Sequence, residues 1–486
     1  MKECYEMICH PLLHIFNRSF ETGIFPNSLK IAIITPIHKK EDKNIFTNYR
    51  PVSVLPVFSK MLEKLMHHRL LSFVDRFEIL YTHQFGFREK RSTSLAILTF
   101  VEKLRKAIDT GEFGLGIFLD FSKAFDTIDH GILLQKLDFY GIRGVANDLM
   151  KSYLTGRKQK TKYNDTLSDQ AEVTCGVPQG SVIGPLFFIL YINDIYLTSP
   201  QLFFVLFADD TNVLLTGKNL QNLQQIAIQE LKHIEQWLVV NRLSLNIAKT
   251  KVIIFSSPNK PCNRGNVKIY LGGKLLKKVE STEFLGVTVD QHLSWKKHIA
   301  AVHYKTSRVI GILYKTKSLL GKRAMLTVYF SLIYSYLNYC NLVWGGVAKT
   351  NINCLHIIQK KISRIATNND FGEHAAPLLQ QLKILNIFDI HLLNCAEFVY
   401  KWINNINGFY RTIFSNYFQT HQETHRYNTR NKGQLLKTKF KNKYGKVSIT
   451  CAGAEVWNNI DPEIRDSKSI GVLKSRIKAH LLKDYV

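Results

Sequence analysis

The sequence contains no C-x-x-C pair and no cluster of cysteine and histidine with the spacing of a zinc site. Zinc fingers, ribbons and knuckles are built on such spacings, so the pattern excludes a structural zinc module of these kinds. Eight cysteines are present, at positions 4, 9, 175, 262, 340, 354, 395 and 451. We expect them to be free thiols in a reducing compartment.

A signal peptide and an apolar membrane span are also missing. Residues 1–6 already carry three charged side chains, and no clean apolar stretch follows them in the first thirty residues. One uncharged run, residues 324–348, is long enough to span a bilayer, but it contains several serine and asparagine residues. Polar groups placed in lipid cost several kcal/mol each on an order-of-magnitude scale. We therefore predict a buried helix over 324–348 and an intracellular protein.

Acidic residues are scarce. The chain of 486 residues has 38 Asp plus Glu against 65 Lys plus Arg, so the net charge is +27. Such an excess implies a polyanionic partner, for which nucleic acid and an anionic membrane surface are the two candidates. The membrane alternative rests on charge alone, because no basic amphipathic anchor is evident.

The shortage of acid is complete over residues 291–369, which contain twelve Lys or Arg and no Asp or Glu in a helical pattern. We predict contact with a nucleic-acid backbone there, and the alternative is a basic surface without a partner. Residues 426–446 hold eight basic residues interleaved with aromatics, a composition that suits single-stranded or loop RNA but also a disordered tail.

Periodicity gives a coarse map of the chain. Residues 31–37 form a β-branched run that predicts a strand, and residues 53–75 and 92–109 have helical spacing. Between 116 and 290 the pattern predicts a strand-rich core with strands at 116–119, 202–207, 212–215, 251–255 and 283–289, and helices at 132–140 and 220–241. Residues 370–486 are less regular.

Three aspartates stand at the ends of apolar strands in this core. Asp209 and Asp210 lie in the predicted hairpin 208–211, and Asp120 closes strand 116–119. Adjacent carboxylates repel each other unless cations neutralise them, although an Asp-Asp pair in a turn is often only a solvated turn. If the strands are neighbours, Asp120 and Asp209 could hold two divalent ions roughly 3.5–4 Å apart, the arrangement used for in-line phosphoryl displacement. Mg²⁺ prefers such oxygen ligands.

A set of short motifs follows in a fixed order around these aspartates. The chain resembles the reverse transcriptases of non-LTR retrotransposons of the Jockey or CR1-like kind, in motif order over about 270 residues. The matching segments are 36–40 (PIHKK), 48–53 (NYRPVS), 84–88 (QFGFR) with Ser92-Thr93, 119–126 (LDFSKAFD), 176–181 (GVPQGS), 207–210 (FADD), 245–251 (LNIAKTK) and 284–287 (FLGV).

The resemblance implies an α+β right-hand polymerase fold. It places the fingers with an N-terminal extension at 1–115 and the palm, with its catalytic strands and a primer-grip-like hairpin, at 116–290. A basic helical thumb follows at 291–369, and a C-terminal extension of undetermined fold at 370–486. The implied function is RNA-directed DNA polymerase, with an RNA template, a DNA primer or target and dNTPs as partners.

The resemblance also assigns roles to single residues. Asp120 and Asp209 would bind two Mg²⁺ ions, for which Mn²⁺ could substitute, and Asp210 would complete the catalytic acidic cluster. Phe125 would stand against the sugar 2′ position and reject ribonucleotides, while Gln179 and Gly180 would line the nucleotide pocket. The alternatives are that Phe125 only packs in the core and that residues 178–180 are simply a turn.

Basic residues complete the implied nucleotide site. Arg50 is the candidate to neutralise the incoming triphosphate, with Lys39 or Lys40 as helpers, because guanidinium binds phosphate through two parallel hydrogen bonds. Lys39 and Lys40 could equally be turn residues that face solvent. Lys249 or Lys251 would protonate pyrophosphate, or would merely carry charge after a helix.

Three further polar residues, Asp126, Asp129 and His130, are interpreted as structural. Asp126 is explained by a helix that begins near it, where an acid favours the helix dipole, and His130 by packing or hydrogen bonding.

Some parts of a complete element are not evident in the sequence. We expect no endonuclease domain before the fingers, because the sequence begins close to them. We also find no second acidic cluster of the RNase H type. The alternative function is therefore a catalytically inactive relic that still binds nucleic acid. The expected location is cytoplasmic at synthesis and nuclear when the enzyme acts on genomic DNA.

Overall fold

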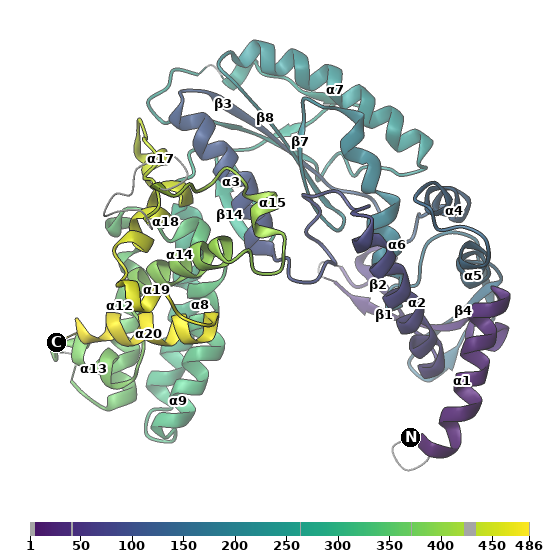
Figure 1. Ribbon diagram of the computed structural model, residues 1–486, viewed down its shortest axis with the longest axis horizontal. Helices are drawn as coiled ribbons and strands as arrows, with labels where there is room; N and C mark the ends of the chain where they lie inside the picture. The colour runs from purple at the N-terminus through teal and green to yellow at the C-terminus, as the bar shows by residue number, and fades with distance from the viewer. Residues whose placement is uncertain (1–4, 40–41, 263, 371, 422–433, 486) are drawn as a thin grey trace.

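The computed structural model describes residues 5–39, 42–262, 264–370, 372–421 and 434–485. The chain forms an arch with an N-terminal lobe, a central sheet and a C-terminal lobe (Figure 1). The N-terminal lobe lies at the right of the view and the C-terminal lobe at the left, and the central sheet joins them at the top.

The central sheet has the strand order β12-β9-β3-β8-β7. Its strands are β3 (Phe113–Leu119), β7 (Phe203–Phe207), β8 (Asp210–Gly217), β9 (Lys251–Phe255) and β12 (Lys277–Lys278). β3 pairs antiparallel with both β8 and β9, so it is the middle strand. Every residue of β3 is buried, as expected for an apolar strand that is covered on both faces.

Helices cover both faces of this sheet and divide the core in two. Helix α3 (Thr93–Asp109) packs on one face, and α7 (Leu220–Val240) packs on the other. Gly116 allows the close approach of α3, because a Cβ atom there would lie 3.3 Å from the ring of Phe100 and 2.8 Å from that of Phe255. The core on the α3 side continues into the C-terminal lobe, and the core on the α7 side continues into the N-terminal lobe.

The N-terminal lobe combines a second sheet with helices. Its strands, in the order β2-β1-β4-β5 with β6 also paired to β4, are β1 (Ile31–His38), β2 (Tyr49–Val54), β4 (Arg157–Tyr163), β5 (Thr166–Leu167) and β6 (Ala171–Val173). Its helices are α1 (Tyr5–Thr22), α2 (Val57–Arg76), α4 (His130–Phe139), α5 (Val145–Leu154) and α6 (Gly184–Tyr191). Short 3₁₀ turns lie at Asn27–Leu29 and Phe46–Asn48. Two others, at Asn193–Thr198 and Arg264–Asn266, lie before β7 and after β9 of the central sheet.

The C-terminal lobe is helical. Its helices are α8 (Lys296–Lys315), α9 (Lys322–Val328), α10 (Ser335–Asn338), α11 (Asn341–Trp344), α12 (Lys349–Thr367), α13 (Ala375–Gln381), α14 (Ile387–Ile403), α15 (Tyr410–Ile413), α17 (Lys443–Lys446), α18 (Ile449–Asn458), α19 (Pro462–Arg465) and α20 (Ile470–Lys483). Two hairpins precede it, β10 (Tyr270–Leu271) with β11 (Lys274–Leu275) and β13 (Ser281–Phe284) with β14 (Val287–Asp290).

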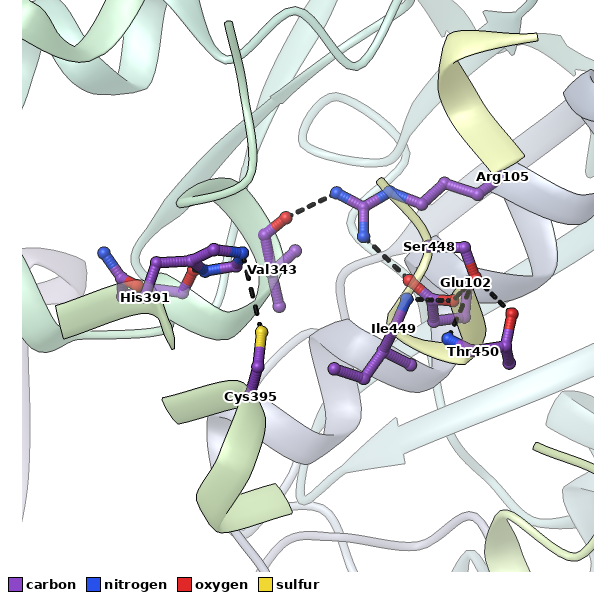
Figure 2. Close-up of polar contacts among 9 residues, drawn as sticks. Glu102, Arg105, Val343, His391, Cys395, Ser448, Ile449 and Thr450 are labelled. Carbon is purple, nitrogen blue, oxygen red and sulfur yellow. Dashed lines mark hydrogen bonds and ion pairs between the residues drawn. The ribbon is translucent and has the colours of Figure 1, made fainter. Parts of the chain in front are cut away.

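A buried polar network joins residues 448–450 of the C-terminal lobe to α3 (Figure 2). Glu102 pairs with Arg105 at 2.7 Å and accepts hydrogen bonds from the hydroxyl of Ser448 and the backbone N–H of Ile449, at the start of α18. Arg105 donates to the carbonyl of Val343 at 2.6 Å. Residues that the sequence pattern left irregular therefore fold as helices of the C-terminal lobe. Residues 426–433 of the aromatic and basic segment 426–446 lie outside the described residues, whereas residues 434–446 belong to the C-terminal lobe.

Two predicted elements differ in the structure. The single strand expected at 283–289 is the hairpin β13–β14, because Leu285 and Gly286 both adopt positive φ angles, 48° and 77°, and reverse the chain. The helix expected at 324–348 is interrupted once. α9, a π-helix at Tyr329–Tyr334 and α10 follow one another without a break, and α11 begins after a gap of two residues. The helical path ends at Tyr339, whose backbone is extended, and Cys340, with φ 51°, precedes α11. Across the described ranges, no helix is both long and apolar enough to cross a membrane.

Most other predicted elements are confirmed within a few residues. The strand at 251–255 and the helices at 92–109, 132–140 and 220–241 correspond to β9, α3, α4 and α7. The predicted helix 53–75 begins only at Val57, because the preceding residues belong to β2 and Pro56 stands at the helix start. The seven cysteines in the described part of the chain are free thiols, as expected.

Candidate active site

The three aspartates lie at one end of the central sheet. β3 ends at Leu119, which pairs with Thr211 of β8. Asp120, which follows β3, and Asp210, which begins β8, therefore lie at the same end of the sheet. Asp209 belongs to the turn between β7 and β8. That turn is tighter than predicted, since Phe207 pairs with Asp210 and only Ala208 and Asp209 lie between the strands.

Asp120 and Asp210 line a common pocket of about 360 Å³. Lys249, Lys251 and the hairpin β13–β14 form other walls of this pocket. The hairpin brings Glu283 near Asp210, an acid that the sequence did not single out. The pocket therefore combines carboxylates and ammonium groups at one end of the central strands.

The electrostatics of the pocket disfavour ionised carboxylates in the absence of cations. The pKa of Asp210 is raised to about 6, first by burial and then by the charges of Asp209, Asp120 and Glu283, in that order. Burial also raises the pKa of Asp120, with a contribution in the same direction from Asp209, while Lys249 opposes the shift most strongly. A cation placed among these groups would relieve the repulsion.

Among the described residues, no group of three or more Asp, Glu, His or Cys side chains converges closely enough to hold a metal ion by itself. Mg²⁺ in phosphoryl-transfer sites is commonly held by only one or two carboxylates, with waters and substrate phosphates as the remaining ligands. Asp120 and Asp210, which share one pocket, and the neighbouring Asp209 fit a site of that kind. Their mutual repulsion is the observation that favours a divalent cation.

The lysines predicted near the triphosphate take different places. Lys249 lies in a turn fixed on Asp120, because the N–H of Asn246 donates to the carbonyl of Asp120 at 2.7 Å. Lys251 begins β9 beside β3. Lys39, although exposed, is near enough to lower the pKa of Asp120. Lys40 lies outside the described residues.

Phe125 is half-buried. Its ring stacks on Phe188 of α6, with ring centres 4.6 Å apart, and meets the ring of Phe87 edge to face at 6.0 Å. Phe125 thus packs against two other rings without being fully buried.

Gln179 and Gly180 are held against β2. The N–H of Ser53 donates to the carbonyl of Gln179 at 2.7 Å. Gly180 has φ 132°, and a Cβ atom there would lie 2.4 Å from the carbonyl oxygen of Ser53, so only glycine fits. On the same strand, Arg50 is exposed and pairs with Ile37 of β1. Segments far apart in the sequence thus meet around Phe125 and Gln179.

Asp126 does not begin a helix, contrary to the prediction. Helix α4 begins at His130, and its N-cap is Asp129, whose carboxylate accepts from the N–H of Ile132 at 2.9 Å. Asp126 instead accepts a hydrogen bond from the amide of Gln179 at 2.8 Å. His130 is structural, as predicted, because its Nε2 lies 2.7 Å from the carbonyl oxygen of Gly176.

Sequence reasoning also assigned no role to Gln84 and Gly86, although both lie in one of the quoted motifs. The carbonyl oxygen of the Gln84 side chain accepts from the N–H groups of Gly86 and Ala208, the residue before Asp209. The contact between Gln84 and Ala208 has no signature in composition or periodicity, since it joins residues 124 positions apart.

Comparison with known proteins gives the family of the chain. Residues 37–289 match the family described as reverse transcriptase (RNA-dependent DNA polymerase). Because this span is more than half of the 486 residues, the chain belongs to that family. Membership and the mixed helix-and-sheet architecture confirm the predicted right-hand polymerase fold. Members of the family generally depend on divalent metal ions.

Individual relatives come from mobile elements. The chain is 28% identical over 387 residues to the probable RNA-directed DNA polymerase from transposon X-element of Drosophila melanogaster, covering 77% of this chain and 42% of the relative. It is 28% identical over 408 residues to the RNA-directed DNA polymerase from mobile element jockey of the same species, covering 81% and 43%. The chain thus spans less than half the length of these curated relatives, which confirm the resemblance drawn from the motifs.

Among solved structures, telomerase from Candida albicans in complex with a fragment of telomeric RNA is similar with a TM-score of 0.44 and 14% identity. The similarity covers 75% of this chain and 68% of that one.

Proposed function

We propose that the chain is an RNA-directed DNA polymerase that adds deoxynucleotides to a primer 3′-hydroxyl on an RNA template. The observation that carries the proposal is that Asp120 and Asp210 line one pocket at the end of the central strands, with Asp209 in the adjoining turn. The divalent ions required by the family would be two Mg²⁺, for which Mn²⁺ can substitute. When bound, they would lower the pKa of the primer hydroxyl and neutralise charge on the transferred phosphate.

The surrounding residues suit the handling of a nucleoside triphosphate. Lys249 and Lys251 supply positive charge beside the carboxylates, and Lys39 adds charge from the N-terminal lobe. Arg50, exposed on β2, would neutralise the triphosphate. Phe125 would face the sugar, where its ring would reject a 2′-hydroxyl by clash, and Gln179 and Gly180 would contact the nucleotide.

The lobes would then have the roles of the parts of a right hand. Residues 1–115 would form the fingers with their extension, 116–290 the palm and 291–369 the thumb, while 370–486 would be an extension that braces the thumb. The basic helices α8 and α12 would contact the backbone of the primer–template duplex, so binding is expected to weaken steeply with salt. Reverse transcription at a genomic target would take place in the nucleus.

The test is primer extension on an RNA template with purified protein, dNTPs and Mg²⁺ or Mn²⁺. Wild type is expected to extend the primer, whereas Asp120→Asn and Asp209→Asn should lose at least about a hundredfold in rate, because each removes charge that holds the metal. Asp165→Asn, at an exposed position between β4 and β5, is the matched control and should extend like wild type.

Two outcomes would contradict the proposal in different ways. If wild type binds the primer–template but extends nothing with either metal, the chain is a nucleic-acid-binding relic and not a polymerase. If wild type extends and Asp209→Asn extends equally well, the polymerase stands but the assignment of its carboxylates is wrong.

A further inference from the structure

The turn that carries Asp209 is braced from outside the sheet. β7 is an edge strand, and residues 83–85 run along it in parallel. The N–H of Phe85 donates to the carbonyl of Leu206 at 2.8 Å, and the N–H of Leu206 donates to the carbonyl of His83 at 3.0 Å. This segment therefore covers the edge of the sheet immediately before the β7–β8 turn.

Ala208, the first residue of that turn, has a strained backbone. Its φ is +55°, in the left-handed region that a residue with a Cβ atom adopts at a cost of about 1–3 kcal/mol. A two-residue hairpin turn normally places glycine or asparagine at such a position. Since Ala208 gains nothing from its own side chain there, its neighbours must hold the conformation.

Gln84 supplies that support. Its side-chain oxygen accepts from the N–H of Ala208 at 3.3 Å and from the N–H of Gly86 at 2.9 Å. Two donors on one end of the amide fix which end carries the oxygen. The side chain is only 1% exposed, and within the described residues its Nε2 has no hydrogen-bond partner. The side-chain oxygen of Gln84, and not its nitrogen, thus makes the contact with the turn.

Gly86 makes this contact possible by its lack of a side chain. A Cβ atom at position 86 would lie 2.2 Å from the backbone nitrogen of Ala208 and 2.8 Å from the carbonyl carbon of Phe207. Both atoms belong to the backbone and cannot move aside independently. Any larger residue would therefore displace the turn, and with it Asp209, from its present position.

We propose that Gln84 is a positioning residue for the metal site, which it serves by holding Ala208 in its left-handed conformation. Without the acceptor at position 84, the buried N–H of Ala208 has no partner and the strain is no longer offset. The turn then relaxes, and Asp209 and Asp210 lose their fixed relation to Asp120. The inference rests on the proposed function, because it assumes that these carboxylates bind divalent ions.

The test replaces Gln84 by methionine, which has a similar length but no strong acceptor, and measures Mn²⁺ binding by electron paramagnetic resonance without any substrate. The matched control is Gln359→Met in α12. Gln359 is also fully buried and its amide donates two hydrogen bonds, to the hydroxyl of Tyr329 at 3.0 Å and the carbonyl of Leu385 at 2.9 Å. Both variants should melt at a lower temperature than wild type.

Only Gln84→Met should also lose Mn²⁺ affinity, by roughly 10–100-fold, the usual effect of removing a residue that orients a metal ligand. Gly86→Ala should weaken Mn²⁺ binding in the same way and gives the same test if Gln84→Met does not fold. Asp209→Asn identifies the binding that belongs to this site.

The proposal is overturned if folded Gln84→Met and Gly86→Ala bind Mn²⁺ as tightly as wild type, or if Gln359→Met loses as much affinity as Gln84→Met. It is overturned as well if Mn²⁺ binding by wild type does not depend on Asp209. Primer extension distinguishes a failure of the positioning role from a failure of the proposed function. A wild type that binds Mn²⁺ through Asp209 but extends nothing refutes the polymerase, while a selective loss in Gln84→Met still supports the positioning role.

Discussion

The side-chain nitrogen of Gln179 lies 2.8 Å from a carboxylate oxygen of Asp126. A carboxylate only accepts hydrogen bonds, so the contact turns the NH₂ end of Gln179 toward Asp126 and leaves its amide oxygen free for another donor. The backbone of Gln179 is fixed at the same time by the N–H of Ser53. In the proposed pocket, this arrangement presents an acceptor of known orientation to the nucleotide.

Removing the carboxylate should therefore weaken nucleotide binding. Asp126→Ala frees the amide of Gln179 to rotate, and we expect KM for the incoming dNTP to rise by about tenfold, equivalent to the loss of one charge-assisted hydrogen bond. Asp126→Asn is the control, because its side-chain oxygen can still accept from Gln179 and should keep KM within about threefold of wild type. Single-nucleotide incorporation on an RNA template measures both. An unchanged KM in Asp126→Ala would show that the contact does not orient Gln179 for substrate.

Phe125, which is half-buried, predicts how the proposed polymerase would select the sugar of its substrate. If the ring excludes the 2′-hydroxyl, Phe125→Ala should raise kcat/KM for ribonucleotides relative to deoxynucleotides by roughly tenfold or more, because the clash disappears. Phe139→Ala is the matched control, since Phe139 is 81% exposed at the end of α4. Competition between the two triphosphates in primer extension measures the ratio. A ratio equal in wild type and Phe125→Ala would leave Phe125 with packing against Phe188 as its role.

The raised pKa of Asp210 predicts a pH-dependent cost to stability. The ordinary value is 3.8 and the value in the folded chain is about 6, so ionisation is harder in the folded than in the unfolded chain. This penalty is absent below pH 4 and complete above pH 6. Asp210→Asn should therefore raise Tm at pH 7.5 and have a smaller effect at pH 4.5.

Divalent cations should reverse that difference. At pH 7.5, Mn²⁺ should raise the Tm of wild type more than that of Asp210→Asn, because the ion binds only the folded site. Asp165→Asn, at an exposed position, should match wild type at both pH values and with Mn²⁺. An Asp210→Asn variant that is less stable than wild type at pH 7.5 without metal would contradict the proposed repulsion.

The sequence predicted the strands that carry the three aspartates because each is a short apolar run that stops at an acid, and such runs have few alternative structures. It did not predict how tight the β7–β8 turn is, since Ala208 has no intrinsic preference for a positive φ angle and adopts it only against Gln84 and Gly86. The misassigned Asp126 has a similar cause. An acid near a helix start is commonly a cap, and only the contact with Gln179 distinguishes it from Asp129.

The C-terminal lobe could not be derived from local pattern either. Helices α17 and α18 are short, and their starts are fixed by acids of α3 that lie more than 300 positions earlier. Asp109 accepts from the backbone N–H groups of Lys441 and Asn442, at 3.0 and 2.8 Å, and Glu102 accepts from Ile449. Periodicity within residues 370–486 carries no trace of these partners.

The network around Glu102 in Figure 2 predicts how strongly the C-terminal lobe depends on α3. Glu102 and Arg105 form a buried ion pair, with 4% and 2% of their side chains exposed. Glu102→Gln leaves the guanidinium of Arg105 facing an amide without its counter-charge, and removing one partner of a buried pair typically costs about 3–5 kcal/mol in the free energy of unfolding. Urea unfolding should show this loss.

The pair Arg18–Glu21 of α1 is the matched control, because it has the same spacing but is about two-thirds exposed, so Glu21→Gln should cost no more than about 0.5 kcal/mol. The double variant Glu102→Gln with Arg105→Met removes both charges and should lose less stability than Glu102→Gln alone, although the carbonyl of Val343 then lacks its donor. Equal losses in Glu102→Gln and Glu21→Gln would mean that the C-terminal lobe is held by apolar packing and not by this pair.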